Sequence, residues 1–477
     1  MTGEELAWLD AVALRDLLAD GQITPAEATD SAIARMTAAN ATLNAVVVPL
    51  PDVGRALAAD PALPRGPFHG VPFLLKDAGA AMAGLPLYMG NGLLRALDWR
   101  PACDTVLGAR FRAAGLVVIG KTAMPEFGCQ PTTAPIAFGA CRNPWDPARS
   151  TAGSSGGAAA AVAAGVVPVA HASDIGGSIR LPAAWCGVVG LKPSRGRTSS
   201  LPITDPNLVE HVITRSVRDT AAFLDAIGGP DPSDVYQLPM PASPYAETMA
   251  DEPHGLRIGY IDSVDDIGVT VDENCVAAVT EAANVLESLG HHVEPGGPDR
   301  LFDEDFATHH LRSSAWEFQH MLDGLATALG RPLTAADVEP YSWALAGVGA
   351  TLTDAAYSAS QTWQRAYTAA VTAWWAQDFD LLLTPAAGEP PAPLDELLPP
   401  PTDPLSLLPR FERIWCFAAP FSVTGQPAIS VPIGQTAQRL PVGVQLVAPL
   451  GREDLLLRVA AQLERAAPWC DRRPPHV

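Results

Sequence analysis

The longest apolar run in the chain is the feature that most constrains its fold. It extends from Ala158 to Ala172 and consists of Ala, Gly and Val, with one Pro and one His near its end. No stretch of the chain reaches the roughly 18 consecutive apolar residues that indicate a membrane-spanning helix. Side chains this small on every face suit an element that is packed on all sides. We therefore interpret the run as a buried helix over 158–164 followed by a buried strand over 166–170.

Strands and helices alternate along the rest of the chain. Apolar runs at 71–75 and 116–119 predict buried strands on either side of a helix over 104–114. Alternation of this kind is typical of an α/β protein with a mixed sheet. With 477 residues, 48% of them hydrophobic, the chain can bury a large core, and no clean domain boundary interrupts it. Further strands are predicted at 256–261, 292–294, 428–433 and 442–447.

Residues 1–60 and 301–375 are predicted to be mainly helical. Thr24, Pro25 and Glu27 have the pattern of a helix N-terminus, with a capping hydroxyl, a proline at the first position and a glutamate three residues after the cap. A Pro-rich stretch at 385–409 is expected to form a surface loop. The tryptophans of the second helical segment either frame an apolar pocket or pack in an ordinary core. They are Trp316, Trp343, Trp363, Trp374 and Trp375.

Composition narrows the classes of partner. The chain carries 52 acidic and 31 basic residues, a formal net charge of −21, whereas a nucleic-acid-binding surface requires clustered positive charge. The N-terminus lacks the basic segment and apolar run of a signal peptide. Seven scattered cysteines form no CxxC pair, which is typical of reduced thiols and not of disulfides or a zinc site. We therefore expect a cytoplasmic protein without nucleic-acid or membrane partners and without a metal or other cofactor.

Residues 115–122 match the phosphate-binding pattern GxxxxGK[ST]. In that motif the residues between the glycines form a loop whose N–H groups wrap a phosphate. Here they are Leu-Val-Val-Ile, which predicts a strand, and Pro125 interrupts the helix that should follow. The structural context of a nucleotide site is missing, so we do not interpret the match as one.

Residues 153–157, Gly-Ser-Ser-Gly-Gly, match GxSxG, the nucleophile elbow of α/β-hydrolases. An elbow joins a strand directly to a helix. The helix is predicted, but residues 143–147, Asn-Pro-Trp-Asp-Pro, lead in as a turn. An Asp and a His would also have to follow, and His211, His254 and His309 all lack a recognisable context. The nucleophile elbow stays open as an alternative to the interpretation of residues 173–182 given next.

The segment 173–182, Ser-Asp-Ile-Gly-Gly-Ser-Ile-Arg-Leu-Pro, has the composition of a catalytic turn. Gly176 and Gly177 lack Cβ atoms, so successive backbone N–H groups can converge on one point. A carbonyl oxygen placed there would become an oxyanion held by preorganised donors, each worth roughly 10²–10³ in rate. Ser178 follows the glycines, where its hydroxyl can attack the same carbonyl carbon. Ser178 is therefore the candidate nucleophile.

A serine nucleophile needs a base at neutral pH. His171 lies seven residues before Ser178, within the preceding strand, and is more typical of a buried structural histidine. Lys76 follows the apolar run Val-Pro-Phe-Leu-Leu, and burial lowers the pKa of a lysine towards the range of a general base. Lys76 is therefore the candidate base.

Together these residues form a pattern that resembles the amidase signature family, from about residue 5 to residue 465. Ser154 and Ser178 are 24 residues apart, which fits the family's spacing. Each glycine cluster alone is common, whereas the whole set is highly specific. The matching segments are 70–77, 120–127, 143–146, 153–157, 174–180, 186–193 and 425–432.

The resemblance implies a Ser–Ser–Lys triad, with Lys76 as the base, Ser154 as the proton shuttle and Ser178 as the acylated nucleophile. It also implies a cis peptide bond before Ser154. The side chains expected to support the turn and orient Lys76 are those of Ser155, Asp174 and Arg180. The implied oxyanion donors are the backbone N–H groups of Ile175, Gly176, Gly177 and Ser178.

The fold implied by the resemblance is a single α/β domain, 1–477, built on one mixed sheet of about eleven strands flanked by helices. A catalytic core is expected at about 65–200 with 415–450, and a mainly helical substrate-pocket region at about 300–410. Ala123 and Ser173 stand where the family often has Asn and Thr. We expect both to alter the pocket wall without touching the triad.

The implied activity is hydrolysis of C–N bonds in linear amides other than peptides, through an acyl-enzyme. The sequence looks closest to bacterial amidases acting on oligoamides or aryl amides, and carbamates (urethanes) and esters present the same carbonyl. Expected partners are such small molecules and a second copy of the chain in a homodimer. Two alternatives stay open. A glutamine-dependent tRNA amidotransferase subunit is disfavoured by the acidic charge, and an inactive binding homologue is disfavoured by the intact Lys76, Ser154 and Ser178.

Overall fold

The computed structural model describes residues 3–203, 205–264 and 267–475. Its main strands are β1 Val46–Pro49, β2 Pro72–Lys76, β3 Val117–Thr122, β6 Val169–Asp174, β7 Val189–Lys192, β8 Val209–Thr214, β9 Arg257–Tyr260, β10 His292–Pro295, β11 Leu381–Pro385, β12 Ala428–Gln435 and β13 Pro441–Val447. Within the described residues these eleven strands form one sheet in the order β1-β3-β2-β6-β8-β7-β12-β13-β11-β9-β10. Pairing is parallel on both sides of β2 and of β9 and antiparallel elsewhere. The predicted mixed α/β fold with about eleven strands is confirmed.

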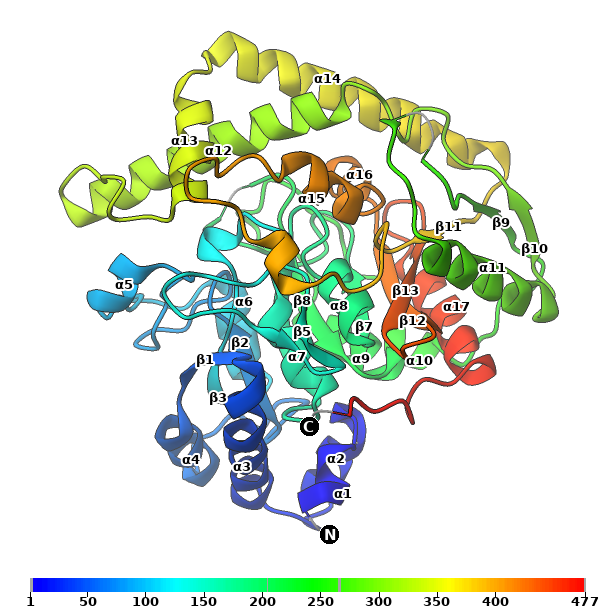
Figure 1. Ribbon diagram of the computed structural model, residues 1–477. Coiled ribbons are helices and arrows are strands. Elements are labelled where there is room, and N and C mark those ends of the chain that lie inside the picture. The colour runs from blue at the N-terminus through cyan, green and yellow to red at the C-terminus, as the bar shows by residue number, and fades with distance from the viewer. Residues whose placement is uncertain (1–2, 204, 265–266, 476–477) are drawn as a thin grey trace.

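Helices cover both faces of the sheet (Figure 1). Helix α3 begins as predicted, because the Thr24 hydroxyl accepts from the Glu27 N–H and the Glu27 carboxylate caps the Thr24 N–H. The α-helices are α1 Gly3–Ala7, α2 Ala11–Ala19, α3 Pro25–Leu43, α4 Pro51–Ala59, α5 Gly92–Ala96, α6 Val106–Ala113, α7 Gly156–Ala163, α8 Arg180–Cys186, α9 Val217–Ile227, α10 Tyr245–Thr248, α11 Glu273–Ser288, α12 Phe306–Leu329, α13 Pro340–Ala350, α14 Asp354–Thr372, α15 Leu408–Trp415, α16 Ala419–Thr424 and α17 Glu453–Ala466.

The central strands are buried on both faces. Successive side chains of a strand point to opposite faces. Leu74 of β2 therefore packs in a core with α3 and α7, whereas Phe73 and Leu75 pack in another with α6 and α9. Burial on both faces explains why such strands read as unbroken apolar runs. All residues of α7 are buried, as predicted, but β6 begins later than predicted because Gly165, with φ +68°, opens a turn first.

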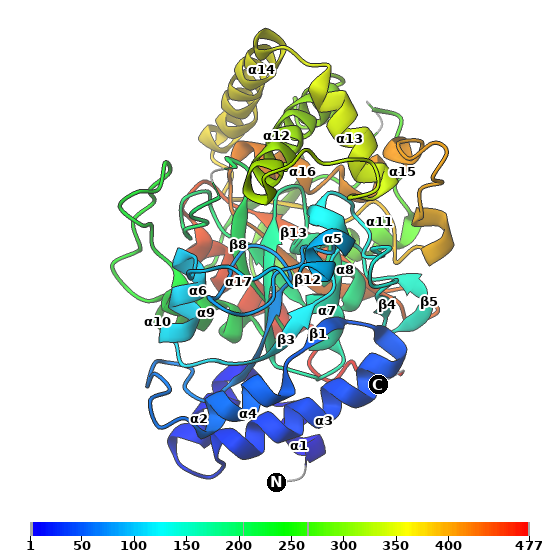
Figure 2. The same cartoon turned by 90° about the vertical axis from the view of Figure 1, so that its left-hand side faces the viewer.

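Helices α12, α13, α14 and α15 form a cap at the end of the molecule opposite α1–α4, as both views show (Figures 1 and 2). The predicted helical character of 301–375 is thus confirmed. Phe318 and Leu322 of α12 share an apolar core with Leu181 and Trp185 of α8, so the cap rests on the helix that follows the candidate nucleophile. Two cap tryptophans belong to internal aromatic pairs, Trp316 with Tyr357 and Trp363 with Tyr367, and Trp374, just after α14, stacks on Phe379.

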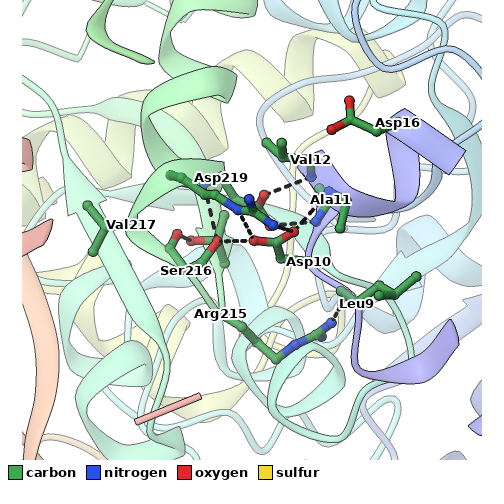
Figure 3. Close-up of polar contacts among 12 residues, drawn as sticks. Leu9, Asp10, Ala11, Val12, Asp16, Arg215, Ser216, Val217 and Asp219 are labelled. Atoms are coloured by element: carbon green, nitrogen blue, oxygen red, sulfur yellow. Dashed lines mark hydrogen bonds and ion pairs between the residues drawn. The ribbon is translucent and has the colours of Figure 1, made fainter. Parts of the chain in front are cut away.

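A cluster of polar side chains connects the N-terminal helix α2 to the start of α9 (Figure 3). The fully buried Asp219 carboxylate accepts from the N–H groups of Ala11 at 2.7 Å and Val12 at 2.9 Å. Asp10 caps α2 and also binds the Arg218 guanidinium, at 2.5 and 2.7 Å. We call this cluster the N-terminal clamp and define it as Asp10, Arg215, Ser216, Arg218 and Asp219.

Two segments differ from the sequence predictions. Strand β1 lies within residues 1–60, where helices were expected, because it pairs with the edge of β3. Residues 143–147 were expected to form only a turn but belong to a hairpin of β4 Arg142–Asn143 and β5 Asp146–Ser150, which pair with each other outside the main sheet. In the described part of the chain, no helix is long and apolar enough to span a bilayer.

Candidate active site

Lys76 ends β2, where its side chain is almost completely buried. Its Nζ donates to Ser154 Oγ at 2.7 Å and to Ser173 Oγ at 2.9 Å. Burial lowers the pKa of Lys76 to about 7, although the carboxylates of Glu210 and Asp174 oppose the shift. An amine with this pKa is neutral in a large fraction of molecules near pH 7 and can accept a proton.

Ser154 and Ser155 lie at the start of α7. The Gly153–Ser154 peptide bond is cis, as the resemblance implied. The Ser155 hydroxyl donates to the Ser173 carbonyl at 3.2 Å and accepts from its N–H at 3.3 Å, which joins α7 to the end of β6. The Ser155 N–H donates to the Ser178 carbonyl at 3.3 Å. The structure thus places the two serine-bearing turns side by side.

The turn between β6 and α8 carries the candidate nucleophile. Gly177 has φ +123°, and a Cβ there would lie 2.8 Å from the side chains of Ala418 and Leu181, so the position requires glycine. The Gly177 N–H donates to Asp174 Oδ1 at 2.7 Å, so one of the four implied oxyanion donors is already engaged. Ser178 is half-buried, at a point where the turn leaves the packed core.

Asp174 and Arg180 form a fully buried pair behind this turn. Nε and Nη2 of Arg180 donate to the two carboxylate oxygens at 3.0 and 2.9 Å, a bidentate arrangement. Burial alone would raise the pKa of Asp174, but the guanidinium outweighs it and the pKa falls to about 2. Nη1 of Arg180 donates to the Ala418 carbonyl and to Gln445 Oε1, both at 2.7 Å. The pair therefore ties the turn to the C-terminal part of the sheet.

Ser173 is the site residue that the sequence analysis misjudged. It was expected not to touch the triad, and that expectation is wrong, because its hydroxyl accepts directly from Lys76. The carboxyl ends of parallel neighbours meet at one edge of a sheet, and Lys76 and Ser173 lie at the ends of the parallel strands β2 and β6. Both strands were predicted, but the second was expected to end at residue 170 and the pairing of the two was not, so the contact became visible only in the sheet.

Ala123 also differs from expectation. Its side chain lies in the core with α3 and α7, not on a pocket wall. Its N–H donates to the Ala45 carbonyl, and its own carbonyl accepts from the Gly157 N–H. Gly157 lets α7 approach this backbone closely, because a Cβ there would lie 2.3 Å from the Ala123 nitrogen.

The phosphate-binding and GxSxG matches can now be compared with the structure. The phosphate-binding pattern runs through β3, as predicted, so its middle residues form a strand and not a loop. The expectation that no strand precedes the GxSxG match is wrong, because β5 ends at Ser150. The Asn143 amide closes this hairpin by donating to the carbonyls of Ser150 and Trp185. Since β5 lies outside the main sheet, the geometry of a nucleophile elbow is still not met.

The cap approaches the nucleophile turn through α12. A Cβ built on Gly176 would lie 3.8 Å from Nε2 of His310, a residue that the sequence analysis did not single out. The His310 ring lies near Phe306 and Trp415, with ring centroids 5.5 and 5.6 Å away. Burial lowers the pKa of His310 to about 4, so its imidazole is neutral at physiological pH. This flank of the turn is therefore aromatic and uncharged.

Comparison with known proteins bears on this geometry. The Amidase family model matches residues 27–457. The chain belongs to the amidase signature family. This amidase is 41% identical to the 6-aminohexanoate-cyclic-dimer hydrolase of Pseudomonas sp. (strain NK87), over 98% of its own length and 96% of that protein. It is 32% identical to an acylamidase of Rhodococcus erythropolis, over 99% and 98% of the two chains.

A solved structure of 6-aminohexanoate cyclic dimer hydrolase complexed with substrate matches the amidase with a TM-score of 0.95 at 39% identity, covering 98% of this chain and 99% of that one. The relatives named above are amide hydrolases. The amidase is accordingly a hydrolase of amide C–N bonds, and the predicted family, fold and reaction class are confirmed.

Proposed function

We propose that the protein hydrolyses amides by forming an acyl-enzyme on Ser178, with Ser154 and Lys76 as its proton relay. The observation that carries the proposal is the 2.7 Å hydrogen bond from the buried Lys76 amine to Ser154 Oγ. The Ser155 N–H to Ser178 carbonyl bond supports it, because it holds the shuttle and the nucleophile on adjacent turns.

In the first half-reaction, Ser178 Oγ bonds to the amide carbon and gives its proton to Ser154 Oγ, while Ser154 passes its own proton to Lys76 Nζ. The C–N bond then breaks, and the relay returns the proton to the leaving amine. In the second half-reaction, water loses a proton to the same relay and attacks the ester carbon. The ester C–O bond then breaks, the relay returns the proton to Ser178 Oγ, and the acid is released.

The oxyanion formed in both halves needs donors in place before the reaction. Because the Gly177 N–H is bonded to Asp174, we assign that group to holding the turn. The proposed donors are then the N–H groups of Ile175, Gly176 and Ser178. The Asp174–Arg180 pair and Ser155 keep these groups in register with Lys76.

We propose uncharged oligoamides and aryl amides as the substrate class. The relatives' names point to amides of this kind, and the aromatic flank around His310 suits an apolar acyl or amine group. Carbamates and esters present the same carbonyl, and we expect hydrolysis of those whose leaving groups fit the site.

Compartment and oligomeric state are separate predictions. The seven free thiols fit a reducing cytoplasm, and light scattering would test whether the chain forms a homodimer.

The two alternatives make different predictions. An amidotransferase subunit would turn over glutamine only with partner proteins and would need a surface for tRNA, which the net charge of −21 disfavours. An inactive homologue would bind amides without consuming them, which the intact Lys76–Ser154 contact disfavours.

The test is a panel of anilides, primary amides, linear and cyclic oligoamides, dipeptide amides and carbamates. It is run with the wild type, Ser178→Ala and, as a matched control, Ser233→Ala at an exposed loop serine. We expect Ser178→Ala to lower kcat by about 10³-fold or more, as for other covalent nucleophiles, and Ser233→Ala to leave it unchanged. Equal loss in both variants, or full activity in Ser178→Ala, would refute the proposal.

A further inference from the structure

A buried group of titratable side chains lies behind Lys76, and the reaction described above does not use it. Its centre is Glu210 of β8, which is 1% exposed. A buried glutamate needs a charged or hydrogen-bonding partner to justify the cost of leaving water. His171 of β6 is the neighbour with a direct contact, Nε2 to Oε1 at 3.3 Å.

The register of the sheet brings Glu210 to the catalytic base. Strands β6 and β8 are antiparallel, and Ser173 lies directly opposite Glu210. Residues opposite each other in such a pair project from the same face with Cβ atoms about 5 Å apart. Ser173 Oγ accepts from Lys76 Nζ at 2.9 Å. The Glu210 side chain therefore starts beside the serine that binds the lysine amine.

The backbone around Glu210 is shaped to admit its carboxylate. Gly79, three residues after Lys76, has φ +71°. A Cβ built on Gly79 would lie 1.7 Å from Glu210 Oε1, so any other residue there would displace the carboxylate. The Thr198 hydroxyl donates to the Glu210 carbonyl at 2.8 Å and holds the strand in place. Position 210 is thus constrained on the side chain and on the backbone.

Several charged groups share this environment. Glu210 raises the pKa of Lys76 more than Asp174 does, in opposition to the burial that lowers it. Burial lowers the pKa of Lys121 to about 8 and also lowers that of His171, which is therefore neutral near pH 7. Asp174 is committed to Arg180. The groups that act on Lys76 or on its partners are Glu210, His171, Asp174, Arg180, Asp77, Lys121 and Lys192.

We propose that Glu210 is a positioning residue for the base: from its place opposite Ser173, it stabilises the ammonium form of Lys76 that arises as Ser178 is acylated. This inference rests on the proposed function. In the acylation step one proton leaves Ser178 and one arrives on Lys76 Nζ, so a positive charge appears on a side chain that is almost completely buried. A fixed carboxylate whose field acts on that charge lowers the barrier without moving.

The sign of the effect on the pH–rate profile follows from this role. Wild-type kcat/KM should fall below about pH 7, where Lys76 becomes protonated. Removing the Glu210 charge lowers the pKa of Lys76 further, so this acidic limb moves to lower pH. The same change makes Lys76 a weaker base, so the plateau falls by roughly three- to tenfold, a fraction of the 10²–10⁴ that a general base supplies in total.

The experiment measures kcat/KM for a chromogenic anilide between pH 5 and 9 in the wild type, Glu210→Gln and Glu453→Gln. Glu453 is the matched control, because it is an equally buried glutamate that pairs with Arg197 and accepts from the Ser194 N–H. We expect the acidic limb of the pH–rate profile to move to lower pH only in Glu210→Gln. In Glu453→Gln the melting temperature should fall while the limb stays in place.

If Glu210→Gln folds and its acidic limb lies at the wild-type pH, the inference is overturned, but the proposed function is not affected. If Glu210→Gln does not fold, Glu210→Asp takes its place, because it withdraws the carboxylate by one methylene, and here too the limb must move to lower pH. If the wild type shows no turnover and no adduct on Ser178, the proposed function itself fails.

Discussion

The catalytic turn and the N-terminal clamp each bury one aspartate completely, yet the two carboxylates are opposite in character. Asp174 is gripped by the Arg180 guanidinium, which holds its pKa at about 2. Asp219 faces two backbone N–H groups and the carboxylate of Asp10, so burial and that neighbour raise its pKa to about 7 (Figure 3). Burial alone therefore does not set the charge of a carboxylate, because the partner decides it.

This difference separates two uses of a buried acid. The turn that carries Ser178, the proposed nucleophile, depends on a permanent charge, since Asp174 orders the Gly177 and Ile179 N–H groups and acts on Lys76 through its field. The clamp needs only an acceptor for the first N–H groups of α2, which a carboxyl group supplies in part even when protonated. The stability of the two regions should therefore respond differently to pH and to neutral substitutions.

The largest effect is expected at the base of the catalytic cluster. Lys76→Ala removes the proposed proton acceptor, so kcat should fall by about 10²–10⁴-fold. Steady-state kinetics on the best substrate of the panel measures it, with a thermal melt to show that the variant is folded. The clamp variants below should keep kcat within about twofold of the wild type. A clamp variant as inactive as Lys76→Ala would abolish the distinction between the two regions.

The next effect concerns the paired carboxylate. Asp174→Asn leaves the Arg180 guanidinium buried without a counter-charge, which should lower the free energy of unfolding by about 3–5 kcal/mol. Urea denaturation at pH 7 measures this. Because the folded pKa of about 2 lies below the ordinary value of 3.8, the stabilisation is present above about pH 4 and is lost as the pH falls towards 2. A loss below about 1 kcal/mol would show that the pair is not the anchor of the turn.

The unpaired carboxylate should behave in the opposite way. Asp219 has a folded pKa above its unfolded value, so the wild type loses stability as the pH rises from about 4 to about 7. Asp219→Asn cannot ionise, so its cost of about 1–2 kcal/mol at pH 4.5 should shrink across that range and reverse sign by pH 8, because a shift of about three pKa units corresponds to roughly 4 kcal/mol. Parallel urea titrations of both proteins test the sign. A cost that grows with pH would mean that Asp219 is ionised and favourably paired.

The smallest effect is expected at the helix cap. Asp10→Ala removes the acceptor for the Ala13 N–H and the exposed contact with Arg218. The loss should be about 1 kcal/mol, typical of an N-cap. Limited proteolysis should show faster cleavage before α2, with kcat unchanged. Proteolysis at the wild-type rate would mean that Asp219 alone holds this segment.

Much of the fold was predictable because the strands that build the site are buried on both faces and therefore appear as unbroken apolar runs. The same runs located Lys76 at a strand end, and the glycine pattern located Ser178. β1 was missed because its pairing at the sheet edge, and not its own composition, makes it a strand. The other residues around the site were only partly predictable. Ser173, Glu210 and His310 come from separate strands and the cap, and only the register of the sheet and the packing of α12 bring them to the site.

The most direct test of acylation at Ser178 is a mass measurement of the covalent adduct that forms on the enzyme. The protein is mixed with a slowly released carbamate or a fluorophosphonate, quenched, and analysed by intact mass and peptide mapping. We predict one adduct per chain, on Ser178, absent in Ser178→Ala and formed at least about 10²-fold more slowly in Lys76→Ala. An adduct on Ser154, or turnover by Ser178→Ala at the wild-type rate, would contradict the account.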